Sequence, residues 1–271
     1  MVLAAVLWST GGLVIKWAPL PGLAVAGGRA VVTALFYLAV LRPSLRRASW
    51  ATAICYAGMI LTFVTATKLT TAASAIFLQY TGTAWVLVAG PRVLGEPLRR
   101  VDWVAAAAAL AAMALCLLDG SEGSHWQGNV LGAVSGVFFA GTVLTMRRDA
   151  RPGSPYDAQA STTLGNLLAA AMALPVSLGD FGAGLAPEAV AALLYLGIAQ
   201  MGIAYLAFLR GLRVVPAATA SLLALAEPAL SPLWVLWGTG EAPGPWTLVG
   251  GALVLLALVG QALWSRGTQE I

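Results

Sequence analysis

The sequence predicts an all-α integral membrane protein: ten transmembrane helices in two inverted five-helix repeats around a central cavity. Three observations predict this fold class. First, 59% of the 271 residues are apolar and only 10% are charged, whereas a soluble domain has about 25% charged residues. Second, the basic residues gather in every second loop. Third, a stretch in the second half of the chain has a counterpart 145 positions earlier.

Ten apolar stretches are close to the roughly 17–25 residues that a helix needs to cross a bilayer. In chain order, the predicted spans are Val2–Trp17, Pro21–Leu41, Trp50–Thr67, Ala72–Val93, Val101–Leu118, Gln127–Arg147, Asp157–Leu178, Glu188–Leu209, Ala217–Trp237 and Pro245–Trp264. The first has neither the basic start nor the cleavage site of a signal peptide, so we expect it to span the membrane. No loop is long enough for a separate domain, and function is therefore expected among the helices.

The basic residues predict the orientation of the chain. One alternate set of loops, with the carboxyl end, holds twelve of the fifteen Lys and Arg residues: Arg42, Arg46, Arg47, Arg92, Arg99, Arg100, Arg147, Arg148, Arg151, Arg210, Arg213 and Arg266. The other set holds only Lys16 and Lys68. Cytoplasmic loops are enriched in Lys and Arg. We therefore expect both termini to lie in the cytoplasm.

Two related stretches divide the chain into halves. Ala217–Glu241 reads AATASLLALAEPALSPLWVLWGTGE and Ala72–Glu96 reads AASAIFLQYTGTAWVLVAGPRVLGE, each closing on a Gly-Glu pair. We predict one five-helix repeat in residues 1–124 and another in residues 125–271. Because five crossings are an odd number, the halves run in opposite directions. Inverted repeats are typical of alternating-access carriers that bind their substrate near the bilayer midplane.

Glu227 is the strongest single candidate for function. A charge at mid-span costs about 2.5–3.5 kcal/mol on insertion scales, so its carboxylate should face protein or water. Pro228 removes a backbone donor and predicts a bend in this helix. Arg29 is another charge well inside a span. It could pair with Glu227 or with a substrate carboxylate, or it could snorkel to the outer interface. Either residue could instead serve only to hold helices together.

Polar and aromatic side chains at span centres complete the candidate site. They are Trp8 and Gly12 in the first span, Gln79, Tyr80 and Thr83 in the fourth, Phe138 in the sixth, and Gln200 and Tyr205 in the eighth. Buried amide and phenol groups need hydrogen-bond partners, which a polar solute or a neighbouring helix could supply. In the sixth span, Gly128, Gly132 and Gly136 form a small-residue stripe that predicts close helix packing.

Other classes of function have little support in the sequence. Cys55 and Cys116 both lie in apolar spans, and His125 is the single histidine, so no disulfide, metal site or cofactor is expected. Ala133-Val-Ser135-Gly136 is close to the motif of rhomboid-type proteases, but His125 lies in a predicted outer loop. No phosphate-binding loop is present. We therefore expect no catalytic residues and no nucleic-acid partner.

Much of the chain resembles a known family. GLRVVPAATASLLALAEPALSPLWVLWGTGE followed by PWTLVGGALVLLALVG is similar to the EamA domain of the drug/metabolite transporter superfamily, and so is ATKLTTAASAIFLQYTGTAWVLVAGPRVLGE. The closing Gly-Glu pairs are the most specific features, and Glu227-Pro228 also fits. Thr83 departs from the pattern, because a proline like Pro228 is expected there. The resemblance implies ten helices in two inverted repeats and a carrier of small metabolites in the bacterial inner membrane. The sequence leaves its oligomeric state open, with a monomer as one possibility.

Within the family the chain looks most like the YddG-type exporters of aromatic amino acids. We therefore expect amino-acid export by alternating access, with a small organic solute and the lipid bilayer as partners. The cavity should be lined by the first, third, fourth, sixth, eighth and ninth spans. Trp8, Tyr80, Phe138 and Tyr205 would hold a side chain, and Gln79, Gln200 and Glu227 would meet polar groups such as an ammonium. Alternatives are a carrier for nucleobases or drugs, a non-transporting membrane scaffold, and an intramembrane enzyme.

Overall fold

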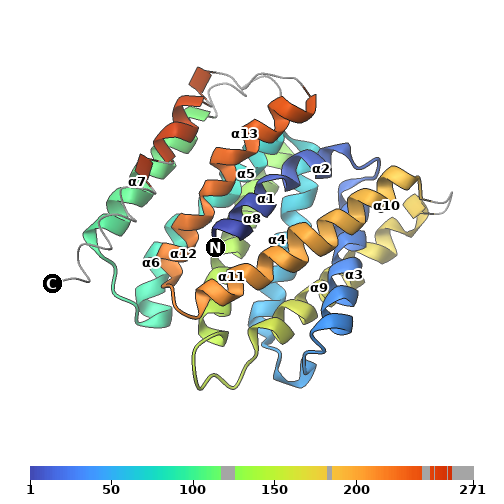
Figure 1. Cartoon of the computed structure of the whole chain (residues 1–271), viewed down its shortest axis with the longest axis horizontal. Coiled ribbons are helices and arrows are strands. Elements are labelled where there is room, and N and C mark those ends of the chain that lie inside the picture. Colours follow the sequence, from blue (N-terminus) through green and yellow to red (C-terminus); the bar gives the residue numbers. More distant parts are fainter. Residues whose placement is uncertain (117–125, 182–184, 240–244, 247, 255, 258–271) are drawn as a thin grey trace.

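A computed structural model of the chain describes residues 1–116, 126–181, 185–239, 245–246, 248–254 and 256–257, and all regular structure in these ranges is helical (Figure 1). In the first half, the helices are α1 (Val2–Ser9), α2 (Gly11–Trp17), α3 (Gly22–Val40), η1 (Leu45–Arg47), α4 (Trp50–Leu69), α5 (Ala72–Tyr80), α6 (Gly82–Leu94) and α7 (Arg100–Cys116). In the second half, they are α8 (Trp126–Asp149), α9 (Ala158–Ser177), η3 (Leu178–Phe181), α10 (Pro187–Leu194), η4 (Tyr195–Ile203), α11 (Ala204–Leu212), α12 (Ala217–Ala224) and α13 (Ala226–Thr239).

Seven helical segments are long and apolar enough to cross a membrane. They are Gly22–Val40, Trp50–Leu69, Ala72–Leu94, Trp126–Asp149, Ala158–Phe181, Pro187–Leu212 and Ala217–Gly238. Each coincides with a predicted span, and Val2–Trp17 is a shorter apolar helix. A helix pairs its own backbone N–H and C=O groups, which lipid cannot do. The all-helical prediction is confirmed for the described residues. His125, Gly240-Glu241, Arg266 and the end of the tenth predicted span lie outside them.

Two predicted spans are interrupted where a threonine hydroxyl bonds back to its own helix. The first span breaks at Thr10, whose hydroxyl donates to the carbonyl of Leu7 at 2.7 Å. The fourth span breaks at Thr81, whose hydroxyl donates to the carbonyl of Leu78 at 2.6 Å. Such back-bonding can bend a helix, but Thr62 in α4 and Thr145 in α8 make similar bonds within continuous helices, so it accompanies these breaks without explaining them. The fourth span is interrupted although Thr83 stands where a proline was expected.

The ninth span breaks at Leu225, between α12 and α13. Pro228 has no N–H to bond the carbonyl of Ala224 four residues earlier, so the helical ladder fails at that turn. The amide of Leu225 instead bonds the carbonyl of Leu222 at 2.9 Å, a tighter turn. The helix is thus interrupted three residues before Pro228, where the sequence predicts a bend.

Helices of the two halves pack closely around α8. Helices α4, α5 and α6 contact α8, while α3 and α4 contact α9. A Cβ atom at Gly82 would lie 2.2 Å from the carbonyl oxygen of Gly136, so only glycine fits where α6 crosses α8. Gly128 and Gly132 similarly approach α4 and α5. The prediction that the small-residue stripe allows close packing is confirmed.

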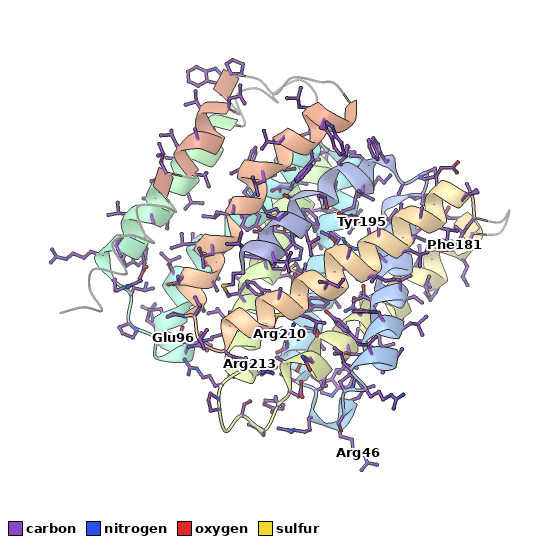
Figure 2. All side chains as sticks on the ribbon, viewed as in Figure 1. Arg46, Glu96, Phe181, Tyr195, Arg210 and Arg213 are labelled. Carbon is purple, nitrogen blue, oxygen red and sulfur yellow. The ribbon has the colours of Figure 1, made fainter. Side chains whose placement is uncertain are left out.

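Charged side chains gather at one end of the bundle. Figure 2 shows Arg46, Glu96, Arg210 and Arg213 near its lower end. Gly95 caps α6 with φ of 65°, a left-handed conformation that glycine adopts without steric cost. The turn at Gly95 directs Glu96 toward helices of the second half. The Gly-Glu pair therefore ends one helix and attaches that end to its neighbours.

Candidate functional site

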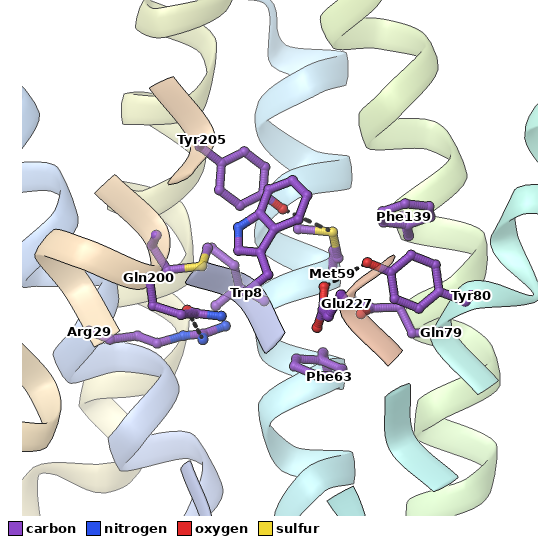
Figure 3. Close-up of a pocket in the computed structure, with 12 residues that line it drawn as sticks. Trp8, Arg29, Met59, Phe63, Gln79, Tyr80, Phe139, Gln200, Tyr205 and Glu227 are labelled. Atoms are coloured by element: carbon purple, nitrogen blue, oxygen red, sulfur yellow. Dashed lines mark hydrogen bonds between the residues drawn. The ribbon is translucent and has the colours of Figure 1, made fainter. Parts of the chain in front are cut away.

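A small cavity lies among the broken helices (Figure 3). Its volume is about 30 Å³, room for about two water molecules. The residues that line it are Trp8, Arg29, Met59, Ile60, Phe63, Gln79, Tyr80, Phe139, Gln200, Met201, Tyr205 and Glu227. Each is at most 6% exposed, so the lining side chains are buried inside the bundle. Ligand sites usually measure about 300–1,000 Å³, and a solute would need the surrounding helices to move apart.

Glu227 forms the acidic end of the cavity. It lies in the first turn of α13, where the amino-terminal end of the helix dipole favours negative charge. Its carboxylate oxygen Oε2 accepts a hydrogen bond of 2.6 Å from the hydroxyl of Tyr80. The break at Leu225 creates this helix start inside the bundle. The interruption that ends α12 thus places the Glu227 carboxylate at a helix amino terminus, where negative charge is stabilised.

Arg29 forms the basic end of the cavity, on the side away from Glu227 in Figure 3. Its Nη1 donates to the side-chain oxygen of Gln200 at 3.2 Å, and its Nε has no hydrogen-bond partner. Gln200 lies in η4, a π-helical segment, and segments of this type are frequent at functional sites. A Cβ atom on Gly11 would lie 2.5 Å from Gln200 Nε2, so this glycine makes room for the amide.

Aromatic rings and thioethers form the walls between the two charged ends. Trp8 contacts Tyr205 with ring centroids 4.8 Å apart, and Tyr80 contacts Phe139 at 5.2 Å. The Tyr205 hydroxyl lies 3.6 Å from the sulfur of Met59. Thioether side chains are flexible and fill irregular spaces. These walls are suited to a flat apolar group and can adjust to its shape.

Six of the nine residues predicted from the sequence line this cavity: Trp8, Gln79, Tyr80, Gln200, Tyr205 and Glu227. The other three lie elsewhere. Gly12 faces Ala72, Ile76 and Ser231. Thr83 is fully buried in α6 without a partner for its hydroxyl. Phe138 packs on Gly58 of α4, and its neighbour Phe139 lines the cavity instead. Substrate binding by any of these residues stays a prediction.

Sequence reasoning did not place six lining residues in the site: Arg29, Met59, Ile60, Phe63, Phe139 and Met201. Arg29 had a visible signal, because it is a charge deep in an apolar span. The other five are apolar, and apolar residues at these depths are equally suited to lipid or core. All six spans that were predicted to line the cavity contribute a residue to its lining, and the second span also contributes one, Arg29.

At the lower end of the bundle in Figure 2, which we call the arginine-rich end, a cluster of ion pairs and hydrogen bonds joins the end of α6 to the second half of the chain. Glu96 Oε1 pairs with Arg147 at 2.7 Å and with Arg151 at 3.0 Å, while Oε2 accepts from the amide of Ala217 at 2.9 Å. Arg147 also donates to the carbonyl of Leu212. Burial by itself raises the pKa of Glu96, but the Ala217 amide and the two arginines outweigh it and hold the pKa below its ordinary value.

No group of three His, Cys, Asp or Glu side chains within the described ranges is placed to hold a metal ion. The side chains that line the cavity offer ionic contact, hydrogen bonding and stacking. An apolar helical bundle with a buried cavity carrying opposite charges at its ends has the features of a solute carrier.

Comparison with known proteins identifies the family. The profile of the EamA-like transporter family matches residues 126–262, about half of the chain. The chain belongs to this family, and the protein is a multi-pass membrane transporter of the drug/metabolite type. It is 29% identical to the "Uncharacterized transporter YwfM" of Bacillus subtilis (strain 168) over 278 residues, which cover 96% of this chain and 91% of the relative.

A solved structure shares the fold. A crystal structure described only as that of a protein superposes with a TM-score of 0.76 over 98% of this chain and 96% of its own. The two sequences are 22% identical, so this likeness concerns the fold alone. Membership of a transporter family indicates a carrier and gives no support to an enzymatic role.

Proposed function

We propose that the protein exports small metabolites, amino acids and above all aromatic ones, through the bacterial inner membrane by alternating access. The observation that supports this most is the buried central cavity, which has charged groups at its ends and aromatic walls between them. The helix breaks at Thr10, Thr81 and Leu225 add support, because carriers commonly build their sites from discontinuous helices.

In this proposal, ten helices form two inverted repeats, residues 1–124 and 125–271, which rock about the cavity. The family match to residues 126–262 corresponds to one such unit. The paired breaks at Thr81 and Leu225 lie 144 positions apart, close to the 145-residue offset of the sequence repeat. Both termini are cytoplasmic, and the arginine-rich end of Figure 2 faces the cytoplasm.

Transport into liposomes tests the proposal. Purified protein is reconstituted and screened for uptake of labelled amino acids, with and without a proton gradient. We expect uptake of aromatic amino acids and at least a ten-fold loss in Glu227→Gln and Gln79→Ala. Uptake at the wild-type rate in both variants would remove these residues from the mechanism. No uptake of any amino acid would refute the proposed substrate class, and uptake of nucleobases or drugs would replace it.

A further inference from the structure

We propose that Arg29 is the carboxylate-binding group of the central cavity and that, opposite Glu227, it makes the carrier selective for zwitterionic solutes. The inference rests on the proposed transport function and adds the charge pattern that a substrate must have. It also assigns one role to Arg29, for which the sequence analysis gave several possible roles.

The first observation is the incomplete hydrogen bonding of a buried guanidinium. Arg29 is 2% exposed, yet among the described residues its side chain donates only from Nη1 to the neutral amide oxygen of Gln200, and its Nε has no partner. A guanidinium has five N–H donors, and a buried donor without a partner is costly. Arg29 lines the cavity, so a ligand there can supply the missing acceptors.

The second observation is that the two buried charges of the cavity do not neutralise each other directly. The ion pairs of the described residues join Arg99 to Asp102, Arg147 and Arg151 to Glu96, and Arg148 to Asp149. Arg29 is held by Gln200 and Glu227 by Tyr80, both uncharged partners. In Figure 3 the Arg29 and Gln200 pair lies on one side of Trp8, and the Glu227 and Tyr80 pair lies on the other.

This separation determines which solute fits. A guanidinium presents parallel N–H groups that match both oxygens of a carboxylate, and the Glu227 carboxylate is suited to an ammonium group. A zwitterion satisfies both ends at once. A simple amine would leave Arg29 unpaired, and a simple acid would leave Glu227 unpaired. An uncompensated charge at this depth is unfavourable. The aromatic and thioether walls accept the apolar part of the same molecule.

Three related compounds test the charge requirement: phenylalanine, its decarboxylated amine phenethylamine, and its deaminated acid 3-phenylpropionate. Each is added to purified protein in detergent and to proteoliposomes taking up labelled phenylalanine. For the wild type, we expect phenylalanine to raise the melting temperature and to compete for uptake. The amine and the acid should do neither at the same concentration. Competition by either as strong as that by phenylalanine would overturn the inference.

Charge-removing variants give the sharper result. Arg29→Gln should weaken phenylalanine binding about 10- to 100-fold, as expected when hydrogen bonds to a charged group are lost, while phenethylamine should then bind at least as well as phenylalanine. Glu227→Gln should shift the preference toward 3-phenylpropionate. If Arg29 were only structural, Arg29→Gln would lower the melting temperature and leave the order of preference unchanged.

Two further variants separate loss of folding from loss of selectivity. Arg29→Lys keeps the positive charge without the planar fork, so it should fold, exclude phenethylamine and bind phenylalanine more weakly. Arg210→Gln removes an exposed arginine outside the cavity and should behave as the wild type. If wild-type protein transports phenylalanine and Arg29→Lys admits the amine, the selectivity claim fails while the transport function stands. If no amino acid is transported, both fail together.

Discussion

Tyr80 shows how single residues determine the chemistry of the cavity. Its hydroxyl donates the 2.6 Å hydrogen bond to Glu227, and its ring packs on Phe139. The same side chain therefore holds the acid and forms part of the aromatic wall. A phenylalanine here would keep the wall and remove the donor.

We expect Tyr80→Phe to destabilise the protein by about 1–3 kcal/mol, because a buried carboxyl group loses its hydrogen-bond donor. Thermal unfolding in detergent measures the effect. Tyr205→Phe is the matched control, since the hydrogen bond of its hydroxyl to a described residue goes to the sulfur of Met59 at 3.6 Å, a weak acceptor. An equal loss of stability in Tyr80→Phe and Tyr205→Phe would show that the hydrogen bond from the Tyr80 hydroxyl has no special role.

At the residue scale, the sequence located the polar members of the site better than the apolar ones. Glu227, Gln79 and Gln200 were identified because polar groups are rare at such depth. The sequence pointed to Phe138, whereas its neighbour Phe139 lines the cavity, because successive helical residues point about 100° apart and the sequence does not reveal how a helix is rotated. Met59 and Met201 have no sequence signal that separates a cavity wall from a lipid-facing surface.

At the scale of elements, the molecule combines continuous helices with interrupted ones. Helices α4 and α8 run unbroken for 20 and 24 residues and pack on each other, whereas the first, fourth and ninth spans break beside the cavity. The break near Pro228 could be predicted, because proline has a known effect on the helical ladder. The break at Thr81 could not, because threonine back-bonding is compatible with a continuous helix.

The crossing of α6 and α8 depends on the absence of a side chain at Gly82. A Cβ atom there would lie 2.2 Å from the Gly136 carbonyl oxygen, which belongs to the backbone and cannot rotate away. We expect Gly82→Ala to destabilise the bundle by about 1–3 kcal/mol through overpacking. Gly90→Ala on the same helix is the control, since its Cβ would approach the neighbouring helix no closer than 3.9 Å, at Leu144. Detergent melting curves compare them, and a stable Gly82→Ala protein would contradict the observed helix crossing.

For the whole molecule, ionic contacts at one end of the bundle hold the two halves of the chain together. Glu96 in the first half bonds Arg147, Arg151 and the amide of Ala217 in the second. The resemblance noted in the sequence singled out the Gly-Glu pair but gave no contact for Glu96. The structure shows a role for each member of the pair: the turn at Gly95 places the Glu96 carboxylate at the start of α12, where it accepts a hydrogen bond from the Ala217 amide.

Acid should weaken this connection. The pKa of Glu96 is lowered from its ordinary value of 4.5 in the folded protein, so its stabilising effect is complete above that pH and is lost as the pH falls through the lowered value. We expect Glu96→Gln to melt below the wild type at pH 7 and the difference to shrink under acidic conditions. The exposed Glu188→Gln is the control. A difference that stayed constant down to pH 3 would mean that the Glu96 charge does not stabilise the fold.

The near-complete burial of the cavity walls has a consequence for the living cell. The described side chains around the centre leave space for about two water molecules, far too few to form a hydrated channel from one face to the other. An ion passing through this centre would have to shed its hydration shell, which is costly. We therefore expect the carrier without its solute to be a barrier to ions at this point.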